Sequence, residues 1–259
     1  WSSDVCSSDL SNSGPTITFS QNGNSTYAKS QSTKITVTAG AAPVVTTTFK
    51  YAWGTNASGT TPSISFTSGA TVTQNTETGN YYVTATACDV AGNCTTVTSN
   101  AFKLDNEAPT ITFGTNGNST YAKSQSSTIN VTDNHSLGNS STYKYIWTAN
   151  PSTENPNNIF TDGASYTKDG VTGDYYLKAY ACDNAGNCTT VTSNAFKLDN
   201  EAPTITFTPD GNTTWAKTQS SKITVTDNKS GGKTDTYKYT WSTSTTATPG
   251  TSFTSGSTY

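Results

Sequence analysis

The sequence lacks several residue types on which nucleic-acid-binding and membrane proteins depend. It contains no Met, no Arg and a single His, and only 12% of its 259 residues are charged. With 14 basic and 17 acidic residues, the formal net charge is −3, so no strongly basic surface is available for nucleic acid. No apolar run approaches the length of a membrane-spanning helix. We therefore expect no nucleic-acid partner and no membrane contact in this segment.

Patterns typical of catalysis are missing as well. His135 is the only imidazole, and no nucleophile–base–acid set can be assembled around it. Gly-rich phosphate loops and paired metal-binding His motifs do not occur. The sequence thus predicts a protein that is not an enzyme and that requires no cofactor.

What the sequence does contain is internal repetition with a period of 94 residues. Trp53, Trp147 and Trp241 keep this spacing, and the phrase SNAFKLDNEAPTITF begins at Ser99 and again at Ser193. A period of this size fits one small β domain per copy. We expect copy one at residues 11–104, copy two at 105–198, and a truncated copy three at 199–259 that lacks its last strands.

The first ten residues, WSSDVCSSDL, fall outside the repeat. They resemble the translation of a sequencing-adapter oligonucleotide, and we treat residues 1–10, including Cys6, as a non-native segment. Because Met is absent and copy three stops short of a full period, we expect the chain to be an internal fragment of a longer protein.

Strands are indicated by period-two alternation of β-branched and aromatic residues, and turns by Asn116-Gly117 and Asp169-Gly170. About seven short strands per copy with a Trp near the middle predict an all-β, Greek-key sandwich of immunoglobulin type. The positions expected to point inward in copy two are Ile111, Phe113, Ile129, Val131, Tyr143, Tyr145, Trp147, Tyr175, Leu177, Ala179 and Ala181.

The stretch TGDYYLKAYACDNAGN from Thr172, followed by a strand and by FKLDNEAPTITF, resembles bacterial Ig-like repeats of surface and secreted proteins. Its Tyr-x-Leu-x-Ala-x-Ala pattern is also similar to strand F of fibronectin type III modules. The resemblance covers residues 11–259. It implies a tandem of immunoglobulin-like sandwiches and is weakly specific for function.

Apart from Cys6 the chain has four cysteines, Cys88, Cys94, Cys182 and Cys188, in two copies of the motif Cys-Asp-x-Ala-Gly-Asn-Cys. The intervening residues should form a hairpin loop that brings two sulfurs together across adjacent strands. We expect surface disulfides Cys88–Cys94 and Cys182–Cys188, with Cys182 facing away from the core. Free thiols and a metal site are the alternatives. Disulfides imply an oxidising compartment.

The linkers between copies carry two carboxylates and an amide in three residues, a composition suited to calcium. In an immunoglobulin-type sandwich, the incoming linker lies at the same end as the loops between strands B and C and between strands F and G. Copy one has Asn12-Ser13-Gly14 and Ala39-Gly40 in place of the acidic residues. The alternative is a polar turn in which Pro fixes the start of the next strand. The candidate calcium residues are Asp105, Asn106, Glu107, Asp133 and Asp183 at the first linker, and Asp199, Asn200, Glu201 and Asp227 at the second.

Near-identical repetition without a catalytic set predicts a structural or adhesive stalk segment of a bacterial cell-surface or secreted protein, located outside the cell. Its expected partners are the neighbouring copies of the chain, with an unidentified surface ligand or glycan as a further candidate. Tyr82, Tyr176 and Tyr180 are expected on the exposed side of a strand, where such rings can stack on sugars or on neighbouring side chains. The alternative function is therefore a carbohydrate-binding accessory region of a secreted enzyme.

Overall fold

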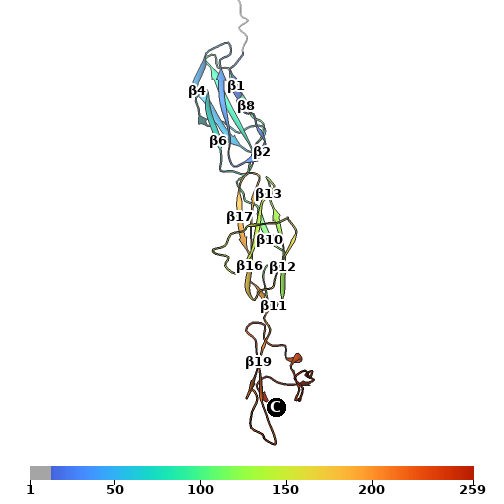
Figure 1. Cartoon of the computed structure of the whole chain (residues 1–259). Coiled ribbons are helices and arrows are strands. Elements are labelled where there is room, and N and C mark those ends of the chain that lie inside the picture. Colours follow the sequence, from blue (N-terminus) through green and yellow to red (C-terminus); the bar gives the residue numbers. More distant parts are fainter. Residues whose placement is uncertain (1–12) are drawn as a thin grey trace, which may run out of the picture. The chain divides into compact units, whose positions relative to one another are not determined.

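The computed structural model describes residues 13–259, so the non-native segment expected at residues 1–10 lies outside the described residues. Strands supply the regular structure of this part of the chain, apart from one short 3-10 turn at Thr234–Thr236 (Figure 1). Within residues 13–259, no helix has the length and apolar character needed to cross a membrane. The predicted all-β fold with sandwich-type sheets is confirmed.

Contacts between Cα atoms group the chain into two compact units. The first contains the described residues up to Thr112, together with Val131–Lys144 and Tyr180–Thr190. The second contains Phe113–Asn130, Tyr145–Ala179 and Val191–Tyr259. The division does not follow the 94-residue repeat, because residues 105–112 and two loop-bearing segments of copy two group with copy one.

Copy one forms two sheets. The first has the strand order β1-β3-β6, and the second has the order β2-β9-β7-β4-β5, with β8 also paired to β7. Strand β2 runs parallel to β9, whereas β4 and β7 pair antiparallel. The strands are β1 (Thr16–Phe19), β2 (Asn24–Ala28), β3 (Gln31–Thr38), β4 (Val44–Gly54), β5 (Ile64–Ser65), β6 (Ala70–Gln74), β7 (Gly79–Asp89), β8 (Cys94–Thr98) and β9 (Phe102–Leu104).

Alternation along the central strands builds the core of copy one, because successive side chains of a strand point to opposite faces. Ile35 on β3 and Val83 on β7 are fully buried. Trp53 packs edge-on against Phe102, with 5.2 Å between the ring centroids. The buried core cluster consists of Ile17, Ile35, Val37, Phe49, Val72, Val83, Ala85, Ala87 and Phe102.

Copy two repeats this arrangement, with sheet orders β10-β12-β15 and β11-β18-β16-β13-β14, and with β17 paired to β16. Strand β11 runs parallel to β18, as β2 does to β9. The strands are β10 (Thr110–Phe113), β11 (Asn118–Ala122), β12 (Ser124–Thr132), β13 (Gly138–Thr148), β14 (Asn158–Ile159), β15 (Ser165–Asp169), β16 (Gly173–Asp183), β17 (Cys188–Thr192) and β18 (Phe196–Leu198).

The alternation predicted for copy two is confirmed at most positions. Trp147 is half-buried and packs edge-on against Phe196, with 4.9 Å between ring centroids. The predicted inward residues that are buried are Ile111, Ile129, Val131, Tyr143, Leu177, Ala179 and Ala181, whereas Phe113, Tyr145, Trp147 and Tyr175 are half-buried.

A buried glutamine in each of these copies was not predicted. Gln125 Nε2 donates to the carbonyl oxygens of Thr120 and Lys197, each at 3.0 Å. Gln31 Nε2 makes the equivalent bonds to Thr26 and Lys103 in copy one, at 3.2 and 3.1 Å. Each amide therefore satisfies two backbone acceptors at the parallel strand pair, which is why a polar side chain is tolerated inside.

The two expected disulfides are present. Cys88 bonds to Cys94 and Cys182 to Cys188, each joining the two strands that flank one hairpin loop. Cys182 lies on the expected strand face, the one it shares with Tyr180, but it is only 6% exposed. The Tyr180 hydroxyl lies 2.9 Å from Cys182 Sγ, so this neighbour on the same strand face covers the sulfur.

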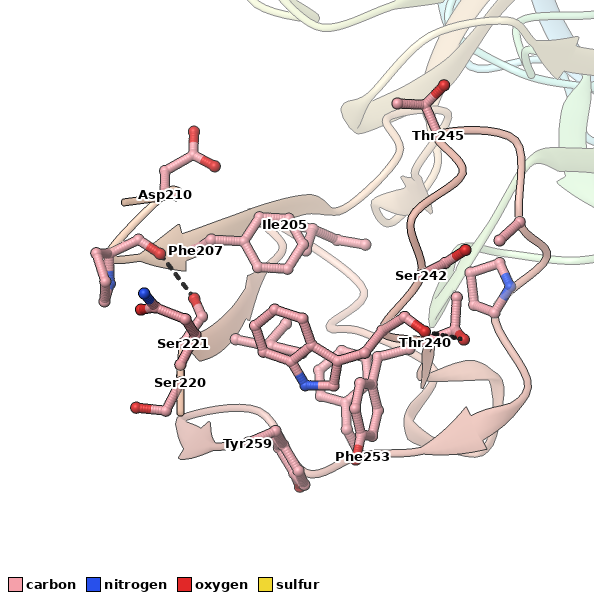
Figure 2. Close-up of a pocket in the computed structure, with 18 of the residues that line it drawn as sticks. Ile205, Phe207, Asp210, Ser220, Ser221, Thr240, Ser242, Thr245, Phe253 and Tyr259 are labelled. Carbon is pink, nitrogen blue, oxygen red and sulfur yellow. Dashed lines mark hydrogen bonds between the residues drawn. The ribbon is translucent and has the colours of Figure 1, made fainter. Parts of the chain in front are cut away.

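Copy three has the sheet β19-β20-β23 and a separate pair, β21-β22. Its inner face is partly uncovered at Trp241, which is 61% exposed, although Ile223 is buried. Phe207 and Phe253 line a pocket at this face (Figure 2). The strands are β19 (Thr204–Thr208), β20 (Lys222–Thr226), β21 (Lys238–Tyr239), β22 (Thr251–Ser252) and β23 (Ser257–Thr258).

The core alternation yields a test on two aliphatic side chains of copy two. Leu177 is fully buried, whereas Ile159 is 78% exposed. Leu177→Ala should lower the local unfolding free energy of copy two by about 3 kcal/mol, since it removes buried surface and leaves a cavity. Ile159→Ala should change it by less than about 0.5 kcal/mol. Hydrogen exchange of peptides from residues 124–198, read by mass spectrometry, measures both. Equal effects would contradict the assigned core.

Candidate metal centre

Three aspartates from separate segments meet at the linker that leads into copy two. Asp105 follows β9, Asp133 follows β12, and Asp183 ends β16. One carboxylate oxygen from each lies within 4.8 Å of the others. Asp105 and Asp183 are essentially inaccessible to solvent, and Asp133 is half-buried. All three belong to the first compact unit.

Asp105 is held by bonds on every side. Its backbone N–H donates to Ala28 O at 3.0 Å, and its backbone carbonyl accepts from Asn187 Nδ2 at 2.9 Å. Its carboxylate accepts from the backbone N–H groups of Glu107 and Ser136, each at 3.1 Å. Asp105 is therefore bonded to copy one through its backbone N–H. It is bonded to copy two through its backbone carbonyl and its carboxylate.

The other two carboxylates each fold their own loop. Asp133 Oδ1 accepts from the backbone N–H groups of His135 and Ser136, both at 2.9 Å. Asp183 accepts from the backbone N–H and the side-chain amide of Asn187, both at 2.8 Å. Short polar side chains favour such turns because they replace a backbone acceptor. The loops thus present carboxylate oxygens at fixed places.

The two loops are also bonded to each other. Asn184 donates its backbone N–H to Leu137 O at 3.1 Å and its side-chain amide to Ser136 O at 3.0 Å. Leu137 adopts a φ of 54°, a left-handed conformation that is strained for a branched side chain, and it is 70% exposed. The strain is maintained by the loop contacts around it.

The cluster has no cationic partner within residues 13–259. The ion pairs His135–Glu107 and Lys233–Asp235 include no cluster aspartate. Three negative charges this close repel one another, and burial strengthens the repulsion. Several carboxylate oxygens around one point are what a hard divalent cation such as calcium requires.

Ser136 adds a further oxygen beside the cluster. Its backbone N–H bonds to both Asp105 and Asp133, yet its hydroxyl oxygen is buried and has no hydrogen-bond partner. Ser136 itself is 6% exposed. An unsatisfied buried hydroxyl is unfavourable, and a bound cation would give it a ligand role. Sequence reasoning missed Ser136, although Ser230 occupies the same position of the repeat.

Two of the predicted calcium residues lie outside the cluster. The Asn106 side-chain amide donates to Lys29 O at 3.1 Å and to Glu77 O at 2.8 Å, so it binds copy one. Glu107 is exposed, and its Oε2 lies 3.9 Å from His135 Nδ1. Asp105 is thus the linker residue that reaches the other two aspartates.

The second linker repeats these local contacts in the second compact unit. Ser230 N–H donates to Asp199 Oδ2 at 3.0 Å, and Gly231 N–H donates to Asp227 Oδ1 at 2.9 Å. Asn200 donates to Lys123 O and Val171 O, whereas the backbone N–H of Glu201 donates to Asp199. The pKa of Asp199 is lowered by hydrogen bonds. The largest effect comes from the Ser230 hydroxyl, and the next from the backbone N–H of Glu201. The counterpart of Asp183 falls beyond Tyr259 in the repeat, so two carboxylates are present here rather than three.

Copy one retains a single aspartate of the set. Asp89 accepts a 2.9 Å bond from the side-chain amide of Asn93, which, with backbone amides of the same loop, lowers the pKa of Asp89 despite its burial. At the position of Asn134 stands Gly40, where a Cβ atom would collide with Ser13 O. Copy one therefore has a close backbone contact at Gly40 and no carboxylate at the counterpart of Asp133, which is Ala39.

One comparison with known protein families agrees with the fold. The family model of the bacterial Ig-like domain matches residues 44–106 and 156–200, which confirms the resemblance for these two segments. A solved structure of Clostridium thermocellum CbhA fibronectin(III)-like modules is similar at 16% identity, with 71% of this chain and 93% of that chain covered and a TM-score of 0.27. No curated protein matches this chain.

The bond between Asn187 and the linker can be tested against a matched residue of copy one. Asn187 and Asn93 both bond to an aspartate of their own loop, but only Asn187 has a bond to the linker carbonyl of Asp105. Asn187→Ala should speed hydrogen exchange at the backbone amides of residues 105–107 by about tenfold, since loss of one buried bond costs on the order of 1 kcal/mol. Asn93→Ala should leave these amides unchanged. Identical exchange in the two variants would refute the role of Asn187.

Proposed function

We propose that this segment is a non-catalytic spacer of a bacterial cell-surface or secreted protein, which holds another domain away from its anchor. The family match supports a structural or accessory module, since Ig-like domains are generally non-catalytic. The two disulfides favour an oxidising, extracellular location. A spacer needs folded units and joints that resist bending, and the linker contacts of Asp105 and Asn106 supply the second requirement.

The joint between copies one and two is, in this proposal, completed by a calcium ion. The observation that carries it is the convergence of Asp105, Asp133 and Asp183 within 4.8 Å. These residues come from the linker and from two loops of copy two, so one ion would crosslink three chain segments. The buried Ser136 hydroxyl supports the same assignment. Calcium here has a structural role and takes part in no reaction.

Calcium added to the full chain should bind with a Kd between about 10 µM and 1 mM, the range of weaker sensor sites and extracellular modules. Binding should also restrict the joint. Isothermal titration calorimetry measures the first effect. The restriction of the joint is measured by electron–electron double resonance between spin labels at the exposed residues Thr73 and Thr167. The distribution of label–label distances should be narrower with calcium than with a chelator.

Two aspartate variants separate ion binding from loop folding. Asp183→Asn and Asp89→Asn each remove one charge from a loop aspartate that bonds to an asparagine four residues later. Only Asp183 belongs to the three-aspartate cluster. Asp183→Asn should weaken calcium binding at least about tenfold, and calcium should no longer narrow the distribution of label–label distances. Asp89→Asn should behave as the parent chain in both measurements. Calcium binding unchanged by Asp183→Asn would eliminate this site.

A carbohydrate-binding accessory region of a secreted enzyme is the alternative function. Its expected contact surface is the outward tyrosine face of β7 and β16. Tyr82, Tyr176 and Tyr180 are half-buried, and Tyr180 lies against Cys182. A glycan array separates the two functions, because a spacer binds no glycan and an accessory module binds at least one.

A further inference from the structure

The Cys182–Cys188 disulfide closes the loop that carries two residues of the joint. The loop connects β16 to β17, and the two cysteines are 6 positions apart. Asp183 directly follows Cys182 and contributes a carboxylate to the three-aspartate cluster. Asn187 directly precedes Cys188 and donates its side-chain amide to Asp105 O at 2.9 Å. The disulfide therefore brackets both loop residues that reach the linker.

The loop has few other bonds that hold its two ends together. Asp183 N–H donates to Asn187 O at 2.9 Å, and Asn187 N–H donates to Asp183 Oδ1 at 2.8 Å. Without the adjacent covalent bond, the loop can adopt more conformations, and only a fraction of them place both residues against Asp105. The apparent affinity of a site falls by the fraction of the chain that holds the binding-competent arrangement. Calcium binding should therefore depend on the disulfide.

The two sulfurs of this disulfide differ in accessibility. Cys188 is exposed, whereas Cys182 is 6% exposed and its Sγ lies 2.9 Å from the Tyr180 hydroxyl. An external thiolate therefore reaches Cys188 Sγ more easily. If Cys182 leaves as a thiolate, the Tyr180 hydroxyl is placed to donate a hydrogen bond to it. An accessible sulfur and a stabilised leaving thiolate both favour thiol–disulfide exchange.

We propose that the Cys182–Cys188 disulfide and the calcium site are coupled, so that reduction of the disulfide weakens calcium binding at the joint. This rests on the proposed calcium joint. The reductant is a dithiol. One of its thiolates attacks Cys188 Sγ, the S–S bond breaks, and Cys182 leaves as a thiolate that takes a proton from water. The second thiolate attacks the reductant's own sulfur in the mixed disulfide, Cys188 is released and protonated, and the reductant becomes a disulfide.

The coupling acts in both directions, because coupling between two equilibria is reciprocal. Calcium must stabilise the disulfide by the same factor by which the disulfide tightens calcium binding. Cys88–Cys94 is the matched control within the chain. It closes an equivalent loop, in which Asp89 N–H donates to Asn93 O at 3.0 Å. Asp89 does not belong to the three-aspartate cluster, so neither calcium nor reduction should link this loop to the joint.

Calorimetric titration with calcium compares the parent chain with two double variants. Cys182→Ser/Cys188→Ser should bind calcium at least about tenfold more weakly, a loss within the usual range of coupling between sites. Cys88→Ser/Cys94→Ser should bind calcium as the parent chain does. Hydrogen exchange of core peptides from β16 verifies that copy two is folded in both variants.

A redox titration of the parent chain tests the same coupling without any substitution. The chain is equilibrated with mixtures of reduced and oxidised dithiothreitol, and alkylation of each cysteine is read by mass spectrometry. Saturating calcium should raise the ratio of reduced to oxidised reagent that half-reduces Cys182–Cys188 at least about tenfold, by the factor lost in the double variant. The ratio for Cys88–Cys94 should stay the same.

Two results would overturn the coupling. They are equal calcium affinity of the two double variants, and a half-reduction ratio of Cys182–Cys188 that calcium leaves unchanged. Either result counts against the coupling alone if the parent chain binds calcium and Asp183→Asn weakens that binding. A parent chain that binds no calcium overturns the calcium joint itself, and the coupling with it.

Discussion

Closure of each sandwich depends on one central strand, β7 in copy one and β16 in copy two. This strand pairs along both of its edges and buries small and branched side chains such as Val83 and Leu177; Val83 pairs with Trp53 of the neighbouring strand. Small side chains are needed there because the indole and a neighbouring phenylalanine already fill much of the layer. Copy three has the aromatic residues without the strand, and Trp241 remains mostly exposed. The aromatic layer therefore does not close without its covering strand.

Much of this architecture could be predicted from the sequence because burial in a half-buried strand follows a period of two. Ile129, Val131, Leu177 and Ala179 were placed inward on that basis alone and are buried. The hairpin disulfides follow from the short spacing of the cysteines. Alternation also placed Cys182 on the face that it shares with Tyr180, but it did not predict the low exposure of the sulfur. Alternation reports which face a residue is on and not whether a neighbour such as Tyr180 covers it.

The candidate site was predictable in outline but not in its ligands. The aspartates of the linker and of two loops could be brought together from the topology of a sandwich, since these segments share one end. The role of Asn106 could not be predicted. A short amide between two carboxylates is typical of a metal-binding segment, but the Asn106 side chain donates to backbone carbonyls of copy one. Gln125, Ser136 and Asn187 were missed for a different reason. In a chain dominated by Asn, Ser and Thr, a single polar residue carries no local signal, and only its burial reveals its role.

The difference between the two complete copies follows from space at the loop end. In copy one, the backbone at Ser13 and Gly14 comes so close to Gly40 that any side chain there would collide with a carbonyl oxygen. In copy two, the corresponding residues are Asp133-Asn134, and the gap between linker and loop is filled by carboxylates that accept backbone N–H groups. Glycine is thus required at position 40, whereas its counterpart Asn134 carries a side chain next to Asp133. Copy two therefore has buried carboxylates at its joint, and burial makes their negative charges unfavourable unless a cation neutralises them.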